Sequence, residues 1–329
     1  MNLTLLYNDP GPQAGPDDLD TLDQVREIRH TLEGLGHGTG ELAVPEDLGL
    51  FRKLLREGRD RLFFNLTDPR SGEGRFIALP PLALEQEGCR YTGCGADALY
   101  LTSNKLLAKR MMASAGIPTP RWIAPGGDET DTDAAGTFVP GTYLVKSVWE
   151  HGSAGMTEDS VFRAGSAKEA RARLSRESGE VFAEAFLPGR EINIGLLVRE
   201  EGTWELLPPS EILYTDPDSR NPFLDYRSKW DEESDAWRMS ARTLEFSGKD
   251  EPLLAELRRI ALDCARLFGL NGYARVDFRL DGEGRPMVME VNANPCLTPG
   301  GGFAAAAERG GISYPEVIRR IIAVPVRRP

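Results

Sequence analysis

The segment that most constrains the fold of this chain is 272–292, GYARVDFRLDGEGRPMVMEVN. Two runs rich in β-branched and aromatic residues flank the turn sequence DGEG, which predicts an antiparallel hairpin that turns at 281–284 or one residue later. If the turn is centred between the last two residues of DGEG, Asp277 lies directly opposite Glu290. Side chains alternate between the two faces of a hairpin, so Asp277 shares its face with Arg275. The opposite face carries the apolar residues Val276, Phe278 and Leu280.

Two carboxylates that face each other across a strand pair repel, unless a cation lies between them. Asn292 would lie opposite Arg275 and add a third oxygen ligand on the same face. Oxygen ligands without His or Cys favour Mg²⁺ over zinc. The pattern therefore predicts a metal site formed by Asp277, Glu290 and Asn292. The alternatives are a solvated hairpin face with incidental charges, and a β-bulge that would change the register.

Length and composition limit what else the chain can be. With 329 residues, 40% apolar and 27% charged, it can form two or three domains with adequate cores. The net charge of −12 argues against nucleic acid as the main partner. No basic signal region and no run of about 18 apolar residues occur, so we expect no membrane span and a cytoplasmic location. Four cysteines form no CxxC pair and only three histidines are present, so zinc spacing is absent and reduced cysteines are expected.

Strands and helices alternate over roughly residues 1–100, which predicts a small parallel α/β unit. A helix is expected over 103–116 with Ser103 as its N-cap. Residues 214–249 are expected to form one long, irregular polar loop. The other expected strands are 3–7, 61–66, 142–148, 181–186, 190–198, 273–280 and 286–292, and the other expected helices are 19–35, 46–57, 76–87, 166–177, 251–268 and 313–322.

The sequence also offers a place for a nucleotide, although it contains neither the P-loop nor the dinucleotide-binding fingerprint. A Mg²⁺ ion held by two or three side chains usually shares its ligand shell with substrate phosphates. Lys105 opens a predicted helix, Lys146 ends a predicted strand, and the loop EHGSAGM (150–156) has small residues whose amides could cradle phosphate. Each feature is weak when taken singly, because a lysine at a strand end is commonly solvated surface.

Taken in order, several motifs resemble the ATP-grasp superfamily, and most closely its D-alanine–D-alanine ligase branch. The resemblance is good from about residue 91 onward and looser before it. The motifs that carry it are NK (104–105), LVKSVWEHGSAGM (144–156), EAFLPGREINIGLL (184–197), DYRSKW (225–230), GYARVDFRLDGEGRP (272–286) and MEVNANP (289–295).

The resemblance implies an α/β ATP-grasp fold with three domains. The N-terminal parallel α/β domain would cover 1–103, the central nucleotide domain 104–187, and the C-terminal metal and catalytic domain 188–329. ATP would be held between the central and C-terminal α+β domains, beneath a lid loop at about 214–249.

The resemblance also implies roles for individual residues. Lys105 and Lys146 would bind the α- and β-phosphates, Glu184 would face adenine, and Glu191 would bind the ribose hydroxyls. The loop over the triphosphate would include Glu150, Gly152, Ser153, Gly155 and Met156. Lys229 in the lid would reach the γ-phosphate, and Arg275 would stabilise the transferring phosphoryl group. The residues that would hold two Mg²⁺ ions, with Mn²⁺ as an alternative, are Asp277, Glu290 and Asn292.

The chemistry that the resemblance implies is ligation. A substrate carboxylate attacks the γ-phosphate of ATP to give an acyl phosphate and ADP, and an amine then displaces phosphate. Such a mechanism depends on positioning and charge neutralisation, so cations and amide donors outnumber acid–base groups.

Several residues depart from the family pattern at positions that read the substrates. Asp68 stands where the family usually has histidine, Gly152 where it has serine, and Trp230 where it has tyrosine. The serine that holds the acceptor carboxylate falls at Gly301, and the glycine after the Asn-x-x-Pro turn falls at Cys296. The residues predicted to contact substrate are Asp68, Trp230, Cys296, Gly300 and Gly301.

We therefore expect an ADP-forming carboxylate–amine ligase with altered amino-acid recognition, whose partners are small carboxylates and amines. The resemblance also implies a homodimer. Three alternatives stay open: a D-alanine–D-alanine ligase proper, a kinase that stops after phosphoryl transfer, and a nucleotide-binding regulatory protein that does not ligate. The sequence identifies neither the acid nor the amine.

Overall fold

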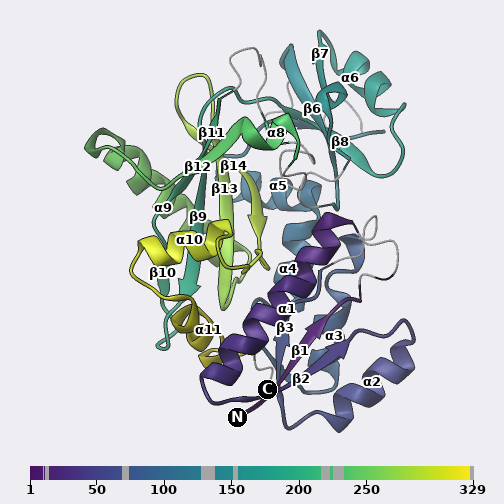
Figure 1. Cartoon of the computed structure of the whole chain (residues 1–329). Helices are drawn as coiled ribbons and strands as arrows, with labels where there is room; N and C mark the ends of the chain where they lie inside the picture. Colours follow the sequence, from purple (N-terminus) through teal and green to yellow (C-terminus); the bar gives the residue numbers. More distant parts are fainter. Residues whose placement is uncertain are drawn as a thin grey trace.

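The computed structural model describes residues 1–9, 11, 15–68, 74–126, 138–150, 155–215, 223–224 and 233–326. Its strands form three sheets (Figure 1). Each sheet takes its strands from one of the three predicted segments. The division into three domains stays a proposal.

The first sheet is parallel, as predicted for the N-terminal segment, and its strand order is β2-β1-β3-β4. Strand β2 was not predicted, because its sequence GTGELA has two glycines and no β-branched residue except Thr39. The strands are β1 (Asn2–Tyr7), β2 (Gly38–Ala43), β3 (Leu62–Asn65) and β4 (Arg90–Tyr91), and the helices are α1 (Pro16–Gly34), α2 (Leu48–Glu57), η1 (Gly74–Phe76), α3 (Leu79–Gln86) and α4 (Ala96–Ser103).

The second sheet is antiparallel, with the order β5-β8-β6-β7. Helix α5 (Lys105–Ser114) precedes it, and the predicted N-cap Ser103 is wrong. Asn104 caps α5 instead, since its side chain accepts a 2.9 Å hydrogen bond from the Leu107 amide, while Ser103 ends α4. The remaining elements are β5 (Trp122–Ile123), β6 (Gly141–Ser147), η2 (Glu158–Ser160), β7 (Val161–Ala164), α6 (Ala167–Leu174) and β8 (Val181–Ala185).

The third sheet has the order β12-β11-β9-β13-β14, with β10 paired to β9. Helix α9 packs on its apolar face, where Ile260 and Cys264 meet Val276 and Phe278 in one buried cluster. The elements are β9 (Glu191–Val198), β10 (Trp204–Leu206), β11 (Ser210–Tyr214), α8 (Asp235–Arg238), β12 (Ser240–Thr243), η3 (Gly248–Asp250), α9 (Glu251–Leu267), β13 (Tyr273–Leu280), β14 (Pro286–Asn292), α10 (Gly302–Arg309) and α11 (Tyr314–Ala323).

In the hairpin of β13 and β14, Asp277 pairs with Glu290, which confirms the prediction. The predicted centre of the turn, from which this pairing was inferred, is wrong. Near the turn, Leu280 pairs with Pro286, so the turn is centred on Glu283 rather than between Glu283 and Gly284. A β-bulge then leaves Met289 without a partner residue and shifts the register by one. The bulge therefore produces the opposition that the sequence argument had assigned to the turn.

The predicted irregular loop 214–249 is also partly wrong. Within it, α8, β12 and η3 are regular, and β12 pairs with β11 at the edge of the third sheet. Its sequence SART is short and polar, a common property of edge strands, so it gave no hydrophobic alternation to detect. Residues 216–222 and 225–232, which include Lys229 and Trp230, lie outside the described residues.

The first and third sheets share a hydrophobic core. Leu5 and Ile28, from β1 and α1, belong to the same buried cluster as Phe303 and Ile318, from α10 and α11. None of the helices in the described part of the chain has the length and apolarity needed to cross a bilayer.

Candidate functional site

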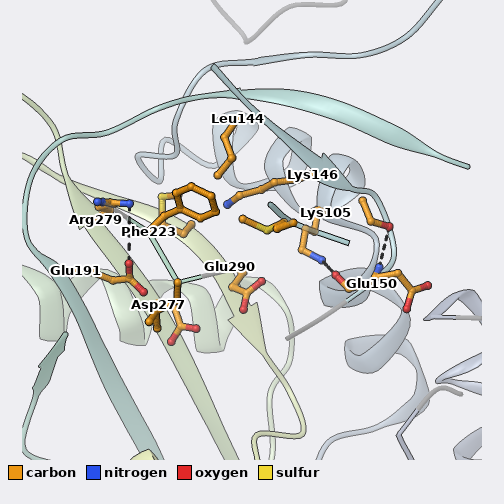
Figure 2. Close-up of a pocket in the computed structure, with 13 residues that line it drawn as sticks. Lys105, Leu144, Lys146, Glu150, Glu191, Phe223, Asp277, Arg279 and Glu290 are labelled. Atoms are coloured by element: carbon orange, nitrogen blue, oxygen red, sulfur yellow. Dashed lines mark hydrogen bonds and ion pairs between the residues drawn. The ribbon is translucent and has the colours of Figure 1, made fainter. Parts of the chain in front are cut away.

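A pocket lies between the second and third sheets and brings most of the predicted nucleotide and metal residues together (Figure 2). Residues of β6 and of the start of α5 line one side, and residues of β13 and β14 line the other. The lining residues are Lys105, Leu144, Lys146, Ser147, Glu150, Met156, Glu191, Phe223, Leu224, Asp277, Arg279, Met289 and Glu290.

The acidic side of the pocket is the hairpin face that the sequence predicted. Asp277 accepts hydrogen bonds of 2.7 and 2.8 Å from the Arg275 guanidinium, and bonds of 2.7 and 3.0 Å from the Asn193 and Asn292 amides. Asn292 also donates to Glu290 at 3.3 Å. Burial works against the charge of Arg275, but Asp277 holds the pKa of that guanidinium above its ordinary value.

These residues fit a divalent cation. Two carboxylates on directly opposed positions, with amide side chains beside them, supply the hard oxygen donors that Mg²⁺ prefers. Among the described residues, no three His, Cys, Asp or Glu side chains cluster as a metal site. The Asn292 amide, whose nitrogen donates to both carboxylates in this structure, would have to turn its oxygen toward the cation to complete the set.

The basic side of the pocket consists of Lys105 and Lys146. The Lys105 amide donates to the Val148 carbonyl at 2.9 Å, which ties the start of α5 to the end of β6 and sets the two lysines side by side. The Lys105 ammonium donates to the Glu150 carbonyl. Burial lowers the pKa of Lys105 to about 8, although Glu290 across the pocket acts in the opposite direction.

A buried ion cluster lies behind Lys146. The Glu184 carboxylate lies 2.5 Å from both the Lys146 and the Lys109 ammonium groups, and Lys109 and Glu184 are each 1% exposed. Burial opposes the charge of Glu184, but the two lysines hold its pKa below the ordinary value. Glu184 is buried behind Lys146 and is not among the pocket-lining residues. Its predicted role beside adenine stays a prediction. Lys109 was not predicted, because nothing in the sequence distinguishes a buried lysine from a solvated one.

A third group of residues lies at the Glu191 end of the pocket, and only Glu191 among them was predicted. The Tyr214 hydroxyl donates to Glu191 at 2.5 Å, and burial followed by the charge of Glu191 raises the pKa of Tyr214. The Arg279 guanidinium lies 4.0 Å from Glu191 and packs over the Phe186 and Tyr214 rings. Arg279 was missed, although its even spacing from Arg275 and Asp277 places it on the same face.

The predicted substrate residues that the structure describes lie outside the pocket lining, on one loop after β3 and one loop after β14. Asp68 is exposed and follows the strand β3. The neighbouring Thr67 carbonyl accepts a 3.1 Å hydrogen bond from Asn294, in the loop that also carries Cys296. The Cys296 thiol donates to Asp20 on α1 at 3.2 Å, and burial raises its pKa to about 12.

Not every predicted residue can be placed in the pocket. Arg275 and Asn292 adjoin it through Asp277, and Gly300 and Gly301 precede helix α10. Gly155 is described, with φ +73°. The residues that lie outside the described part are Gly152, Ser153, Lys229 and Trp230.

This arrangement can bind a polyanion together with a cation. Lys105 and Lys146 on one side would neutralise phosphates, and the carboxylates on the other side would hold a divalent cation. Such opposed charges support phosphoryl transfer, in which positioning and charge neutralisation dominate.

Comparisons with known proteins agree with this chemistry. The family model described as "D-ala D-ala ligase C-terminus" matches residues 111–323. A D-alanine–D-alanine ligase of Cupriavidus pinatubonensis is 31% identical over 82% of this chain and 77% of its own length. One of Gloeobacter violaceus is 29% identical over 98% of each.

Solved structures show the same fold. The D-alanine–D-alanine ligase from Bacillus anthracis complexed with ATP superposes with a TM-score of 0.69 at 21% identity, over 98% of this chain and 95% of that one. The D-alanyl-alanine synthetase A from Vibrio cholerae gives a TM-score of 0.70 at 17% identity, over 98% and 97%.

Proposed function

Because this chain belongs to the D-alanine–D-alanine ligase family, with its ATP-grasp fold, we propose that it joins a small carboxylic acid to an amine at the expense of ATP. The observation that supports the proposal most is that Lys105 and Lys146 face Asp277 and Glu290 in the same pocket. A pocket with positive charges on one side and negative charges on the other suits a nucleoside triphosphate and its divalent cation.

In this proposal, different residues of the pocket bind different parts of the nucleotide. Lys105 and Lys146 bind the phosphates, and Glu191 binds the ribose hydroxyls. Asp277, Glu290 and Asn292 would hold Mg²⁺, which would supply positive charge to neutralise phosphate. Met289 and Leu144 supply apolar contacts at the pocket surface.

The reaction follows from these positions. An oxygen of the substrate carboxylate attacks the γ-phosphorus of ATP, and the bond to the β-phosphate oxygen breaks to release ADP. The amine nitrogen then attacks the acyl carbon of the acyl phosphate and loses a proton to solvent, while the bond to the phosphate oxygen breaks, which releases phosphate and leaves an amide. Arg275, held by Asp277, would donate hydrogen bonds to the oxygens on which negative charge develops. The part of Lys229 and of a closing lid in this reaction stays a prediction.

We also propose that the substrates differ from two D-alanines. Asp68, Cys296 and Gly301 replace the residues that the family uses at these positions, and a site that loses hydrogen-bonding partners rejects the former ligand, often by about 10⁴-fold. The competing candidate is a D-alanine–D-alanine ligase proper, which the names of the relatives favour. The predicted three domains, the homodimer and the cytoplasmic location belong to the same proposal.

A screen of ADP release over pairs of D- and L-amino acids and small carboxylates, with product masses, tests the proposal. We expect ADP release that depends on both substrates, together with a product lighter by one water than their sum. ADP without a condensed product would indicate a kinase, and ATP binding without turnover for any pair would indicate a regulatory protein. Turnover of several per second with millimolar D-alanine alone would establish the competing candidate.

A further inference from the structure

An arginine outside the nucleotide pocket lies on the same face of the third sheet as the pocket residues. Arg242 of β12 pairs with Ile212 of β11, Ile212 pairs with Glu191 of β9, and Glu191 pairs with Arg279 of β13. Directly paired residues of an antiparallel sheet share a face. The register therefore places Arg242 on the face that carries Glu191, Asp277 and Arg279.

The guanidinium of Arg242 reaches the glycine run that follows β14. It donates a 3.0 Å hydrogen bond to the Gly300 carbonyl. A Cβ built on Gly302 would lie 3.7 Å from Arg242 Nε, so the guanidinium packs against this glycine. Because residues 300–302 have no side chains, Arg242 supplies a charged side chain beside this glycine run.

The turn itself is fixed from the other side by helix α1. Asp20 accepts a 2.9 Å hydrogen bond from the Thr298 hydroxyl, and Gln24 accepts one of 2.9 Å from the Leu297 amide. The carbonyl that holds Arg242 therefore belongs to a loop with defined anchors, as a selective site requires.

No ion pair joins Arg242 to a carboxylate among the described residues, whereas Arg275 is bonded to Asp277. Arg242 is exposed as a whole residue, yet partial burial of its guanidinium, and then repulsion from Arg275, lowers its pKa. Two guanidinium groups close together favour an anion, and the planar fork of arginine matches a carboxylate.

We propose that Arg242 binds the carboxylate of the amino acid whose amine attacks the acyl phosphate, which makes it a specificity-determining residue. The assignment rests on the proposed ligase function. Arg242 lies beside the glycine turn and does not line the nucleotide pocket, so a substrate carboxylate suits it better than a phosphate of ATP. The acceptor class is then an amino acid with a free carboxylate, rather than a simple amine or an amino-acid amide.

The experiment compares each active acceptor amino acid with its carboxamide, in the wild type and in Arg242→Ala and Arg242→Lys. We expect Arg242→Ala to raise KM for the amino acid by about 10- to 100-fold, the usual range for losing a hydrogen bond to a charged group. KM for the carboxamide and for ATP should stay unchanged, so the preference for a free carboxylate disappears. Arg242→Lys should restore part of it, because the charge remains.

Arg238→Ala is the matched control. Arg238 is an exposed arginine of α8 that pairs with Asp235 at 3.7 Å, so its removal should leave both KM values unchanged. The assignment would be overturned if Arg242→Ala raised KM equally for the amino acid and for its carboxamide, or raised KM for ATP alone. Either result would leave the ligase function intact. A wild type that condenses no pair would overturn both.

Discussion

Asp277 and Glu290 lie opposite each other, yet different groups surround their carboxylates. Asp277 accepts close hydrogen bonds from Arg275 and from the asparagines Asn193 and Asn292. Glu290 accepts a longer bond of 3.3 Å from Asn292 and faces the lysines across the pocket. Its negative charge therefore lies between the acidic and the basic sides of the pocket.

Replacing that charge without changing the shape tests the metal assignment. We expect Glu290→Gln to lower turnover by at least about 10²-fold, because preorganised charge stabilisation is lost. Thermal stability should be retained, since the amide has the same volume. Steady-state kinetics with a Mg²⁺ titration measure the effect. Glu283→Gln, at the exposed turn of the same hairpin, is the control, and near-wild-type activity of Glu290→Gln would contradict a metal role.

The low pKa of Lys105 predicts how nucleotide affinity depends on pH. The charged lysine attracts phosphates, and with a pKa of about 8 it loses its proton as the pH rises above that value. ATP affinity should therefore be constant below about pH 7 and fall between about pH 8 and 10, where binding must first restore the proton. Calorimetric titration of a non-hydrolysable ATP analogue measures this. In Lys105→Arg, which stays charged, the fall should disappear; an identical pH dependence in both proteins would contradict the assignment.

Single residues were predictable from the sequence where a strand periodicity or a family motif marked them. Lys105, Lys146, Asp277 and Glu290 all meet in the pocket. Lys109 was missed because its function is to neutralise Glu184 inside the protein, and a lysine buried to 1% exposure has no distinctive pattern in sequence.

At the scale of elements, the buried ion cluster connects α5 to β6 and β8. Glu184 of β8 holds Lys109 of α5 on one side and Lys146 of β6 on the other. The Lys109 ammonium also donates to the Thr119 hydroxyl at 2.8 Å. Both lysines are thus oriented by one carboxylate that does not touch the pocket.

Removing that carboxylate should destabilise the fold. We expect Glu184→Gln to lower the free energy of unfolding by about 3 kcal/mol at pH 7, because Lys109 is left buried without its counter-charge. The folded-state pKa of Lys109 is already below its ordinary value, and in the variant it falls further. Stability should therefore recover as the pH rises through that lowered pKa toward 10.

Urea unfolding at pH 7 and pH 9.5 measures both effects. Glu177→Gln, which removes the partially exposed partner of Arg173, should change stability little at either pH. A loss for Glu184→Gln that is the same at both pH values would show that Lys109 is not the group left uncompensated.

Element prediction succeeded where apolar residues alternated and failed where they did not. The strands of the hairpin were placed correctly, whereas β2, rich in glycine, and β12, a short polar edge strand, were not recognised. The pairing of Asp277 with Glu290 depends on a bulge at Met289, and the strand sequence contains no residue that predicts this bulge.

At the scale of the whole molecule, the N-terminal segment touches the second sheet beside the pocket. The Gly74 amide of η1 donates to Glu150 at 3.2 Å, and a Cβ at Gly74 would lie 2.4 Å from the Trp149 carbonyl. Arg75 also pairs with Glu180 at 2.6 Å. This close approach holds Glu150, whose carbonyl accepts from Lys105.

A methyl group at position 74 should therefore weaken nucleotide binding from a distance. We expect Gly74→Ala to weaken ATP affinity by about 10-fold, since overpacking typically costs about 1–3 kcal/mol and here displaces residues 149–150. Equilibrium titration with an ATP analogue is the measurement. Gly282→Ala, where a Cβ meets nothing within 4 Å, is the control. Unchanged affinity in Gly74→Ala would mean that the pocket is independent of the N-terminal segment.

The core shared by the first and third sheets has a consequence for the time course of synthesis. Leu5 and Ile28 pack with Phe303 and Ile318, and the Val326 amide bonds to Tyr91 at the edge of the first sheet. The N-terminal and C-terminal members of this core are separated by roughly 300 residues in the sequence. At a synthesis rate of about 5–20 residues per second, the C-terminal members follow about 15–60 s later. During that interval the emerging N-terminal unit presents an uncovered apolar face and an open sheet edge, both of which attract chaperones. Nascent chains stalled before residue 300 should accordingly stay protease-sensitive in β1 and α1, and chains stalled after the C-terminal helices have left the tunnel should not.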